Sequence, residues 1–119
     1  MQFIEYPTCT TCRKAKRFLD ERGAEYEDRN IKERNPDLEE LRSLWQRSGL
    51  PLKKFFNTSG ASYRALGGKA AVDAMTEDQQ LEQLSKDGML VKRPILAGDD
   101  FVLVGFREED WAAALDGER

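Results

Sequence analysis

The first thirty residues change from an extended hydrophobic pattern to a helical one and back again. Residues 2–6 favour a short strand that ends at Pro7, and residues 8–21 favour a helix that ends at Gly23. Alternation over residues 24–29 indicates a second strand. A strand, a helix and a strand over this length are typical of a parallel βαβ unit. The apolar stripe of the helix is Cys12, Ala15, Phe18 and Leu19.

The middle of the chain has only helical patterns. Asn35-Pro36 predicts the start of a helix that ends at Gly49, and its buried stripe is Leu38, Leu41, Leu44 and Trp45. Short helical segments follow over residues 51–56 and 62–66, before Gly67-Gly68. Thr76 and Gln79 form a predicted capping box, and the helix that they begin should close at Gly88.

The last part of the chain returns to an extended pattern. Residues 93–97 and 101–104 flank Gly98-Asp99-Asp100, which predicts a β-hairpin. Residues 106–115 predict a final helix with Trp111 and Leu115 facing inward. The order of elements predicts an α/β protein with a mixed sheet and an all-helical insertion. With 119 residues, no repeat and no linker, we expect one domain over residues 1–119.

Composition and charge narrow the classes of function. Hydrophobic residues make up 39% and charged residues 34%, with a net charge of −3, which argues against broad binding to nucleic acid or to an anionic membrane. Histidine is absent, so histidine-based catalysis and Cys/His zinc sites are excluded, and two cysteines are too few for a structural zinc site. With no secretory signal and no long apolar run, we expect a cytoplasmic protein without a metal.

The two cysteines, Cys9 and Cys12, lie three residues apart where the first helix is predicted to begin. This spacing is within reach of a disulfide, and free N–H groups at a helix start favour a thiolate over a thiol. Cys9 comes first and precedes the apolar stripe, so we assign it as the nucleophile. Cys12 lies on the stripe and should be the more buried, resolving thiol. In a reducing compartment such a pair favours redox chemistry.

Basic residues form a second group of candidates. Lys92-Arg93-Pro94 precedes the hairpin, where an arginine could either remain a solvated charge or lie near a thiolate and bind an oxyanion or carboxylate. The residues alone favour the solvated alternative. The basic face of the first helix is likewise interpreted as solvated surface. That face consists of Arg13, Lys14, Lys16 and Arg17.

Residues 6–15, Tyr6-Pro7-Thr8-Cys9-Thr10-Thr11-Cys12-Arg13-Lys14-Ala15, resemble the opening motif of the ArsC/Spx (arsenate reductase) family. Arg93-Pro94-Ile95 resembles the family's second motif, and residues 57–60, 63–67 and 104–106 follow in its order and spacing. The resemblance covers nearly the whole chain. It implies a thioredoxin-like, glutaredoxin-like fold with a helical insertion at about residues 31–91. It also implies a cis Arg93-Pro94 bond whose loop lies against Cys9, which reverses the preference for a solvated Arg93.

The family implies three functions. The first is a thiol–disulfide oxidoreductase, with Cys9, Cys12 and Arg93 as catalytic residues. The second is an arsenate reductase, although that class carries an arginine near the position of Asn57 and Gly-Thr-Ser where this chain has Thr-Thr-Cys. The third is an Spx-like regulator that binds the RNA polymerase α subunit. The implied residues for substrate or oxyanion binding are Thr10, Thr11, Arg13 and Pro94.

The expected partners follow from these functions. We expect a small thiol or disulfide substrate, and glutathione or thioredoxin as electron donor through a glutaredoxin or thioredoxin system. No bound cofactor, no direct nucleic-acid contact and no membrane are expected, and the protein should be a monomer.

Overall fold

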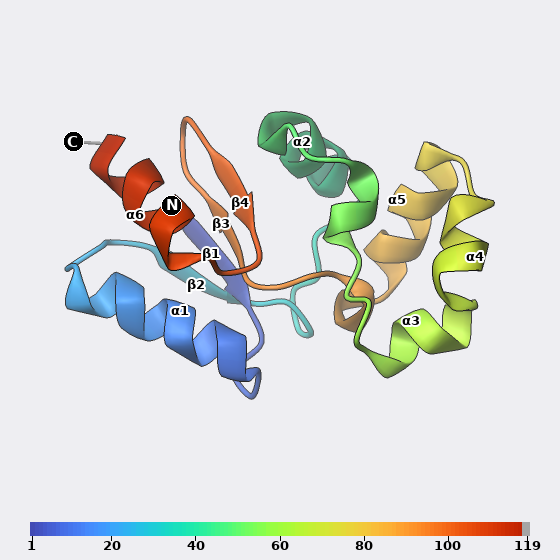
Figure 1. The fold of residues 1–119 in the computed structure, drawn as a ribbon, viewed down its shortest axis with the longest axis horizontal. Helices are drawn as coiled ribbons and strands as arrows, with labels where there is room; N and C mark the ends of the chain where they lie inside the picture. Colours follow the sequence, from blue (N-terminus) through green and yellow to red (C-terminus); the bar gives the residue numbers. More distant parts are fainter. Residues whose placement is uncertain (118–119) are drawn as a thin grey trace.

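The computed structural model describes residues 1–117. Helices and strands follow one another in the order expected for a βαβ unit, a helical segment and a hairpin with a terminal helix (Figure 1). Their bounds are β1 Gln2–Glu5, α1 Thr10–Glu21, β2 Glu27–Asn30, α2 Leu38–Ser48, α3 Ala61–Leu66, α4 Gly68–Asp73, α5 Glu77–Lys86, β3 Ile95–Ala97, β4 Val102–Val104 and α6 Glu108–Gly117. Short 3₁₀ helices lie at Leu52–Phe55 and Gly88–Leu90.

Over residues 1–117 the strands form one mixed sheet of four strands, in the order β2-β1-β3-β4. Strand β1 is parallel to β2, with Ile4 opposite Arg29. It is antiparallel to β3, with Ile4 opposite Ile95, and β3 pairs with β4 as a hairpin. The α/β class, the parallel βαβ unit and the mixed sheet predicted from the sequence are confirmed.

The two faces of the sheet pack against different helices. Phe3 and its partner Leu96 are buried with residues of α1 and α6, among them Leu19 and Trp111. Ile4 and its neighbours point the other way, because side chains alternate along a strand, and they are buried with α2, α5 and the segments between them. Figure 1 shows α1 and α6 on one side of the sheet and α2 to α5 on the other.

Helix α2 begins two residues later than the sequence pattern predicts. Asp37 is its N-cap: the Asp37 side chain accepts a hydrogen bond from the Glu40 N–H, and the Glu40 side chain accepts one from the Asp37 N–H. Asn35 has a different role, because its side-chain amide donates to the carbonyls of Leu84 and Ser85 near the end of α5. The residue predicted as a cap therefore links the segment before α2 to the end of α5.

The end of α5 also differs from the prediction. The capping box of Thr76 and Gln79 is confirmed, but the helix ends at Lys86 and Gly88 opens a 3₁₀ turn. A Cβ at Gly88 would lie 2.4 Å from the carbonyl oxygen of Ile31. Gly88 is therefore required for close packing against a distant loop and is not the end of a helix.

Further differences from the prediction concern β2, α4 and α6. Strand β2 occupies Glu27–Asn30, so residues 24–26 precede it, and α6 covers Glu108–Gly117. Helix α4, Gly68–Asp73, was not predicted, because Gly67-Gly68 was interpreted as the end of a helix. Both glycines have positive φ, 115° and 68°, so they form a sharp turn between two short helices.

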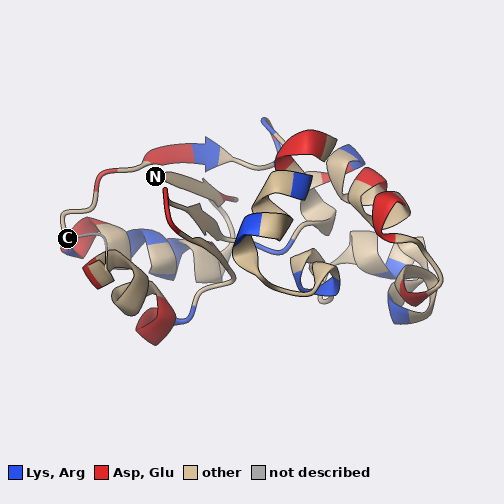
Figure 2. Cartoon of the chain, turned by 90° about the horizontal axis from the view of Figure 1, so that it is seen from above, with Lys and Arg blue, Asp and Glu red and all other residues tan. Residues whose placement is uncertain are grey.

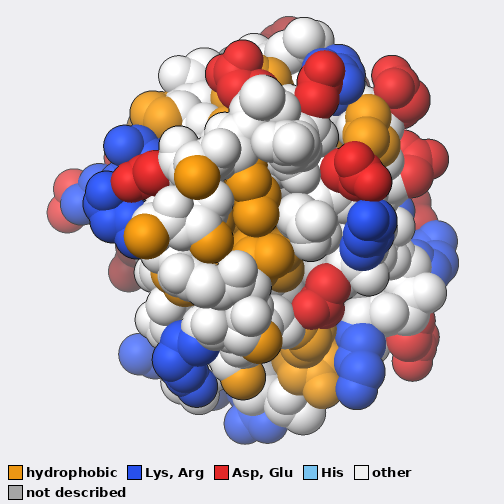
Figure 3. Space-filling view, turned by 90° about the vertical axis from the view of Figure 1, so that its right-hand side faces the viewer, with side chains coloured by type: hydrophobic (Ala, Val, Ile, Leu, Met, Phe, Trp, Pro, Cys, Tyr) orange, Lys and Arg blue, Asp and Glu red, His pale blue; other side chains and the backbone are white. Residues whose placement is uncertain are grey.

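Charged side chains are frequent on the edge strand β2 and on the helical insertion. Figure 2 shows acidic and basic residues along β2, the strand at the edge of the sheet, where charges oppose pairing with other chains. One of them, Arg29, is nearly buried and donates two hydrogen bonds to the Glu40 carboxylate, at 2.7 and 3.2 Å. This pair fastens the insertion to the sheet. Figure 3 shows the far end of the insertion, with apolar side chains in the middle of the face.

Candidate active site

Cys9 lies at the N-terminus of α1, directly after the loop that follows β1. It is the N-cap residue, with extended backbone, and its Sγ accepts a hydrogen bond from the Cys12 N–H at 3.4 Å. The Cys9 N–H donates to the Tyr6 carbonyl at 3.0 Å, which fixes the loop. The Cys9 thiol is half-buried. The sulfur therefore takes the place of the oxygen that usually caps a helix, where free N–H groups stabilise a negative charge.

Cys12 lies in the first turn of the same helix and is fully buried. Burial raises the pKa of the Cys12 thiol to about 12, and the neighbouring Cys9 and Glu5 act in the same direction, while a hydrogen bond with the Tyr6 backbone opposes them. Cys12 is therefore a thiol at neutral pH. The sequence predicts that Cys12 is the more buried of the two cysteines, and the structure agrees.

Arg93 precedes β3 through a peptide bond to Pro94 that is cis, as the resemblance implies. Its Nη1 donates to the carbonyls of Met89 and Val91, at 3.4 and 3.2 Å, and its Nε is buried without a hydrogen-bond partner. The guanidinium lies 5.5 Å from the centre of the Tyr6 ring. The structure thus brings Arg93 to the loop that holds Cys9, although none of its hydrogen bonds within residues 1–117 reaches the sulfur.

The other predicted binding residues lie on the first turn of α1 and just before β3. Thr10 and Thr11 are exposed on that turn, and Pro94 is buried directly before Ile95, the first residue of β3. Arg13 is exposed, and its Nε donates to the Pro7 carbonyl at 3.1 Å. Arg13 therefore braces the Cys9 loop.

Glu5 is a residue that the sequence analysis did not select. It is the last residue of β1 and only 4% exposed. Burial, followed by the hydrogen bond and charge of Asp28, raises the pKa of Glu5 to about 7, and the charge of Lys16 opposes the shift. The signal was present in the pattern: Glu5 follows the inward-facing Phe3 by two residues, which places both on the same face of a strand.

Lys16 corrects the interpretation of the basic face of α1 as plain solvated surface. Its Nζ donates to the Asp28 carboxylate at 2.9 Å and to the Tyr26 hydroxyl at 3.0 Å. Both bonds hold the pKa of Lys16 above its ordinary value, and the bond to Asp28 helps to keep the pKa of Asp28 below its own. The Tyr26 hydroxyl in turn donates to Asp20 at 2.7 Å. Lys16 is therefore part of a polar network that extends from β2 to α1.

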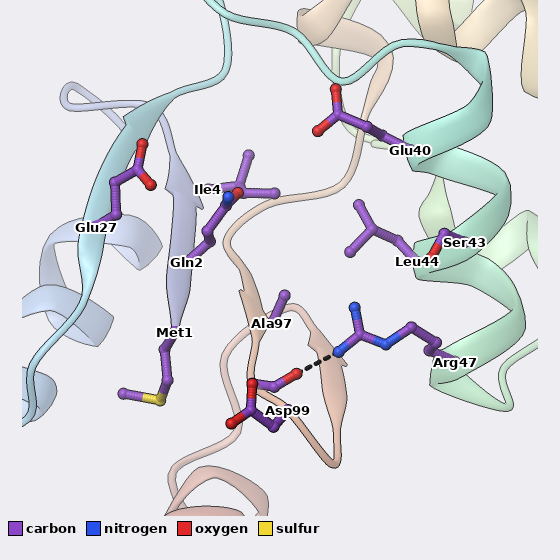
Figure 4. Close-up of a pocket in the computed structure, with 11 residues that line it drawn as sticks. Met1, Gln2, Ile4, Glu27, Glu40, Ser43, Leu44, Arg47, Ala97 and Asp99 are labelled. Carbon is purple, nitrogen blue, oxygen red and sulfur yellow. Dashed lines mark hydrogen bonds between the residues drawn. The ribbon is translucent and has the colours of Figure 1, made fainter.

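One hollow of the surface runs along α1 and is lined by Arg13 among other residues. Two others are lined by neither cysteine. One, of about 500 Å³, opens between the sheet and α2, where Figure 4 shows the Arg47 guanidinium reaching across to the Gly98 carbonyl. Its lining includes Met1 and Gln2 at the start of β1, whereas Cys9 follows the end of that strand. A second hollow, of about 350 Å³, borders Lys92. Neither contains a predicted site residue.

Residues 1–117 contain neither a cluster of metal-binding side chains nor a helix suited to a membrane. No group of three or more Cys, Asp or Glu side chains is close enough to hold a metal ion. No helix in this range is long and apolar enough to cross a membrane.

Comparisons with known proteins agree with the fold. The model of the ArsC family matches residues 4–114, and the chain belongs to this family. Its relatives include the uncharacterized protein YusI of Bacillus subtilis, which is 51% identical over 94% of this chain and 98% of its own. More distant relatives include the global transcriptional regulator Spx of Listeria innocua, 27% identical over 87% of this chain and 78% of its own.

Solved structures of the family superpose closely. A protein from Bacteroides fragilis described as ArsC family related is 47% identical, with a TM-score of 0.92 over 94% of both chains. A protein from Streptococcus mutans UA159 described as a possible arsenate reductase is 44% identical, with a TM-score of 0.84 over 93% of this chain and 96% of that one. The family thus includes both regulators and proteins described as reductases, and the thioredoxin-like fold is confirmed.

Proposed function

We propose that the protein is a thiol–disulfide oxidoreductase in which Cys9 attacks and Cys12 resolves. The observation that supports this is the unequal pair at the start of α1. The Cys9 sulfur is accessible and accepts the Cys12 N–H, whereas the Cys12 thiol is buried in the same helical turn. Such an arrangement keeps one sulfur ready for attack and holds the second close enough to form a disulfide.

The reaction needs no bound cofactor. Cys9 thiolate attacks a small disulfide, forms a mixed disulfide and releases one thiolate. Cys12 then attacks the Cys9 sulfur, gives the Cys9–Cys12 disulfide and releases the second thiolate. Substrate gains two electrons, and the protein dithiol loses them. Two molecules of glutathione, or one dithiol protein such as thioredoxin, would return them, in a cytoplasmic and monomeric enzyme of one domain.

Single cysteine variants test the assignment. Cys9→Ser should abolish turnover of a small disulfide, whereas Cys12→Ser should accumulate a mixed disulfide that mass spectrometry detects on Cys9. Each variant is the matched control for the other, because both remove one thiol from the same turn. Turnover that persists in Cys9→Ser would refute the assignment.

Arsenate reduction is the second candidate, supported by the relative described as a possible arsenate reductase. Cys9 would attack the arsenic, and Arg93 would hold the oxyanion. Asn57 stands near the position where arsenate reductases carry an arginine, and its side chain donates to the Met89 carbonyl at 3.4 Å. We therefore expect weak activity or none when arsenate is supplied with a glutaredoxin or thioredoxin system.

Regulation is the third candidate, supported by the Spx relatives and by the dithiol that this chain carries. It predicts a direct complex with the C-terminal domain of the RNA polymerase α subunit, in one redox state of Cys9 and Cys12. A pull-down with the purified domain, in reduced and oxidised protein, tests it. Absence of binding in both states would eliminate this candidate.

A further inference from the structure

Strand β4 is the edge of the sheet opposite β2 (Figure 1). The two edges differ in their side chains. Strand β2 carries acidic and basic residues, whereas Val102–Val104 contains no charged residue and no proline. Charges and prolines are the usual means by which an edge strand is kept from pairing with another chain. The sequence of β4 therefore does not oppose the addition of a further strand.

The hydrogen bonds of the hairpin show which backbone groups of β4 face outward. The Gly105 N–H donates to the Pro94 carbonyl of the neighbouring strand segment at 2.8 Å. Bonded and non-bonded pairs alternate along an antiparallel ladder, so Leu103 also bonds to β3. The N–H and C=O groups of Val102 and Val104 then point away from β3. Within residues 1–117 no backbone group outside the hairpin bonds to them.

A groove of about 310 Å³ opens beside these outward groups. Its lining includes Val102–Gly105, Ser48 and Leu50 at the end of α2, and Trp111 of α6. Helices α2 and α6 pack on opposite faces of the sheet. A hollow that residues from both faces line must lie at the edge of the sheet. The outward groups of β4 therefore face a space that the side chains of this protein leave open.

The groove is basic. Lys54, Lys92 and Arg107 line it with exposed side chains, and Asp110 is the one acidic lining residue within residues 1–117. None of the three basic residues forms an ion pair in that range. Lys54 and Lys92 also line the hollow of about 350 Å³ described above, so the two hollows adjoin at these lysines. This local positive charge, in a chain of net charge −3, favours an acidic occupant.

We propose that β4 binds an extended acidic segment of another protein as a fifth strand of the sheet. Backbone hydrogen bonds to Val102 and Val104 hold the segment, and its carboxylates lie against Lys54 and Lys92. A second copy of this chain is a poor occupant, because pairing of two β4 edges would bring the same basic side chains together. Lys92 directly precedes Arg93, so the groove places the bound partner beside the loop of the proposed redox site. Binding does not depend on the reaction of the two cysteines.

Fluorescence anisotropy with the full-length protein tests the charge. The probe is a fluorescein-labelled peptide, Glu-Glu-Val-Thr-Val-Glu-Glu, and its control has lysine in place of every glutamate. The acidic peptide should bind saturably and more weakly as salt is added, and the lysine peptide should not bind. Lys54→Glu combined with Lys92→Glu should weaken binding by about tenfold or more. Lys14→Glu combined with Lys32→Glu changes the net charge equally at exposed positions outside both hollows, and should change the affinity by less than about twofold.

Nuclear magnetic resonance of the isotope-labelled wild type tests the pairing itself. With saturating acidic peptide, the amide protons of Val102 and Val104 should exchange with solvent about tenfold more slowly or less than that rate, and that of Leu103 should change less. Absence of saturable binding, equal binding of the two peptides, equal weakening in the two double variants, or no slowing at the two valines would each overturn the proposal. Slowed exchange at these valines in concentrated protein without peptide would assign the edge to a second copy, and would overturn it as well.

Discussion

Glu5 should make the stability of the fold depend on pH above the range in which carboxylates ordinarily titrate. Its pKa is raised from an ordinary value of 4.5 to about 7, so the native state binds this proton more tightly than the unfolded chain. The resulting stabilisation is fully present below pH 4.5 and is lost as the pH rises through 7. At about 1.4 kcal/mol per pKa unit, this amounts to about 3 kcal/mol, a large part of the stability of a small domain.

The measurement is urea unfolding of wild type and Glu5→Gln under reducing conditions, from pH 4 to pH 8, followed by tryptophan fluorescence. Glutamine does not titrate, so the difference in free energy of unfolding between the two proteins should change by about 3 kcal/mol in favour of the variant as the pH rises. The chain has no histidine to titrate in this range. In the control Glu27→Gln the difference should vary by less than about 0.5 kcal/mol, because exposed ion pairs contribute little. A difference between wild type and Glu5→Gln that is flat between pH 5 and 8 would refute the argument.

Three further substitutions test the packing and the site. Trp111→Ala should lower the free energy of unfolding by about 3–5 kcal/mol, because it empties a buried volume and removes a hydrogen bond of 3.0 Å to a backbone carbonyl; a loss below about 1 kcal/mol in urea unfolding would contradict this. Gly88→Ala should cost about 1–3 kcal/mol, since its Cβ would lie 2.4 Å from a backbone oxygen, whereas Gly117→Ala, with open space around it, should cost nothing by the same assay. Arg93→Ala should slow the alkylation of Cys9 by iodoacetamide at pH 7 about two- to fivefold, the effect of a neighbouring charge worth about 0.5–1 kcal/mol, and an unchanged rate would remove Arg93 from the site.

Features with a local cause could be predicted from the sequence. The capping box at Thr76 and the left-handed glycine at Gly49 are formed by residues within a few positions of one another, and both are present in the structure. The alternation of Phe3 and Ile4 assigns the two faces of β1 without any knowledge of the rest of the chain. The dithiol at a helix start is equally local, and its geometry agrees with the expectation.

Features with a distant cause could not be predicted. Asn35 resembles a cap until α5, far along the chain, is placed beside it, and Gly88 resembles a helix end until Ile31 is placed against it. The contact between Arg93 and the Tyr6 ring is of the same kind. The family resemblance implied only that the Arg93-Pro94 loop lies against Cys9. Glu5 is the exception: its pattern was local, but a charged residue at a strand end is usually taken for the edge of the buried segment.

Because β1 lies in the middle of the sheet, the order in which its two neighbours are synthesised determines when the sheet can form on the ribosome. Its first neighbour, β2, follows within the βαβ unit, but its second neighbour, β3, is made only after the whole helical segment, since Ile4 pairs with Ile95. During synthesis the nascent chain therefore presents one open, apolar strand edge until its last quarter emerges. Late pairing of this kind slows folding and exposes intermediates to association. Helix α1, with its two thiols, is complete long before the sheet that will support it.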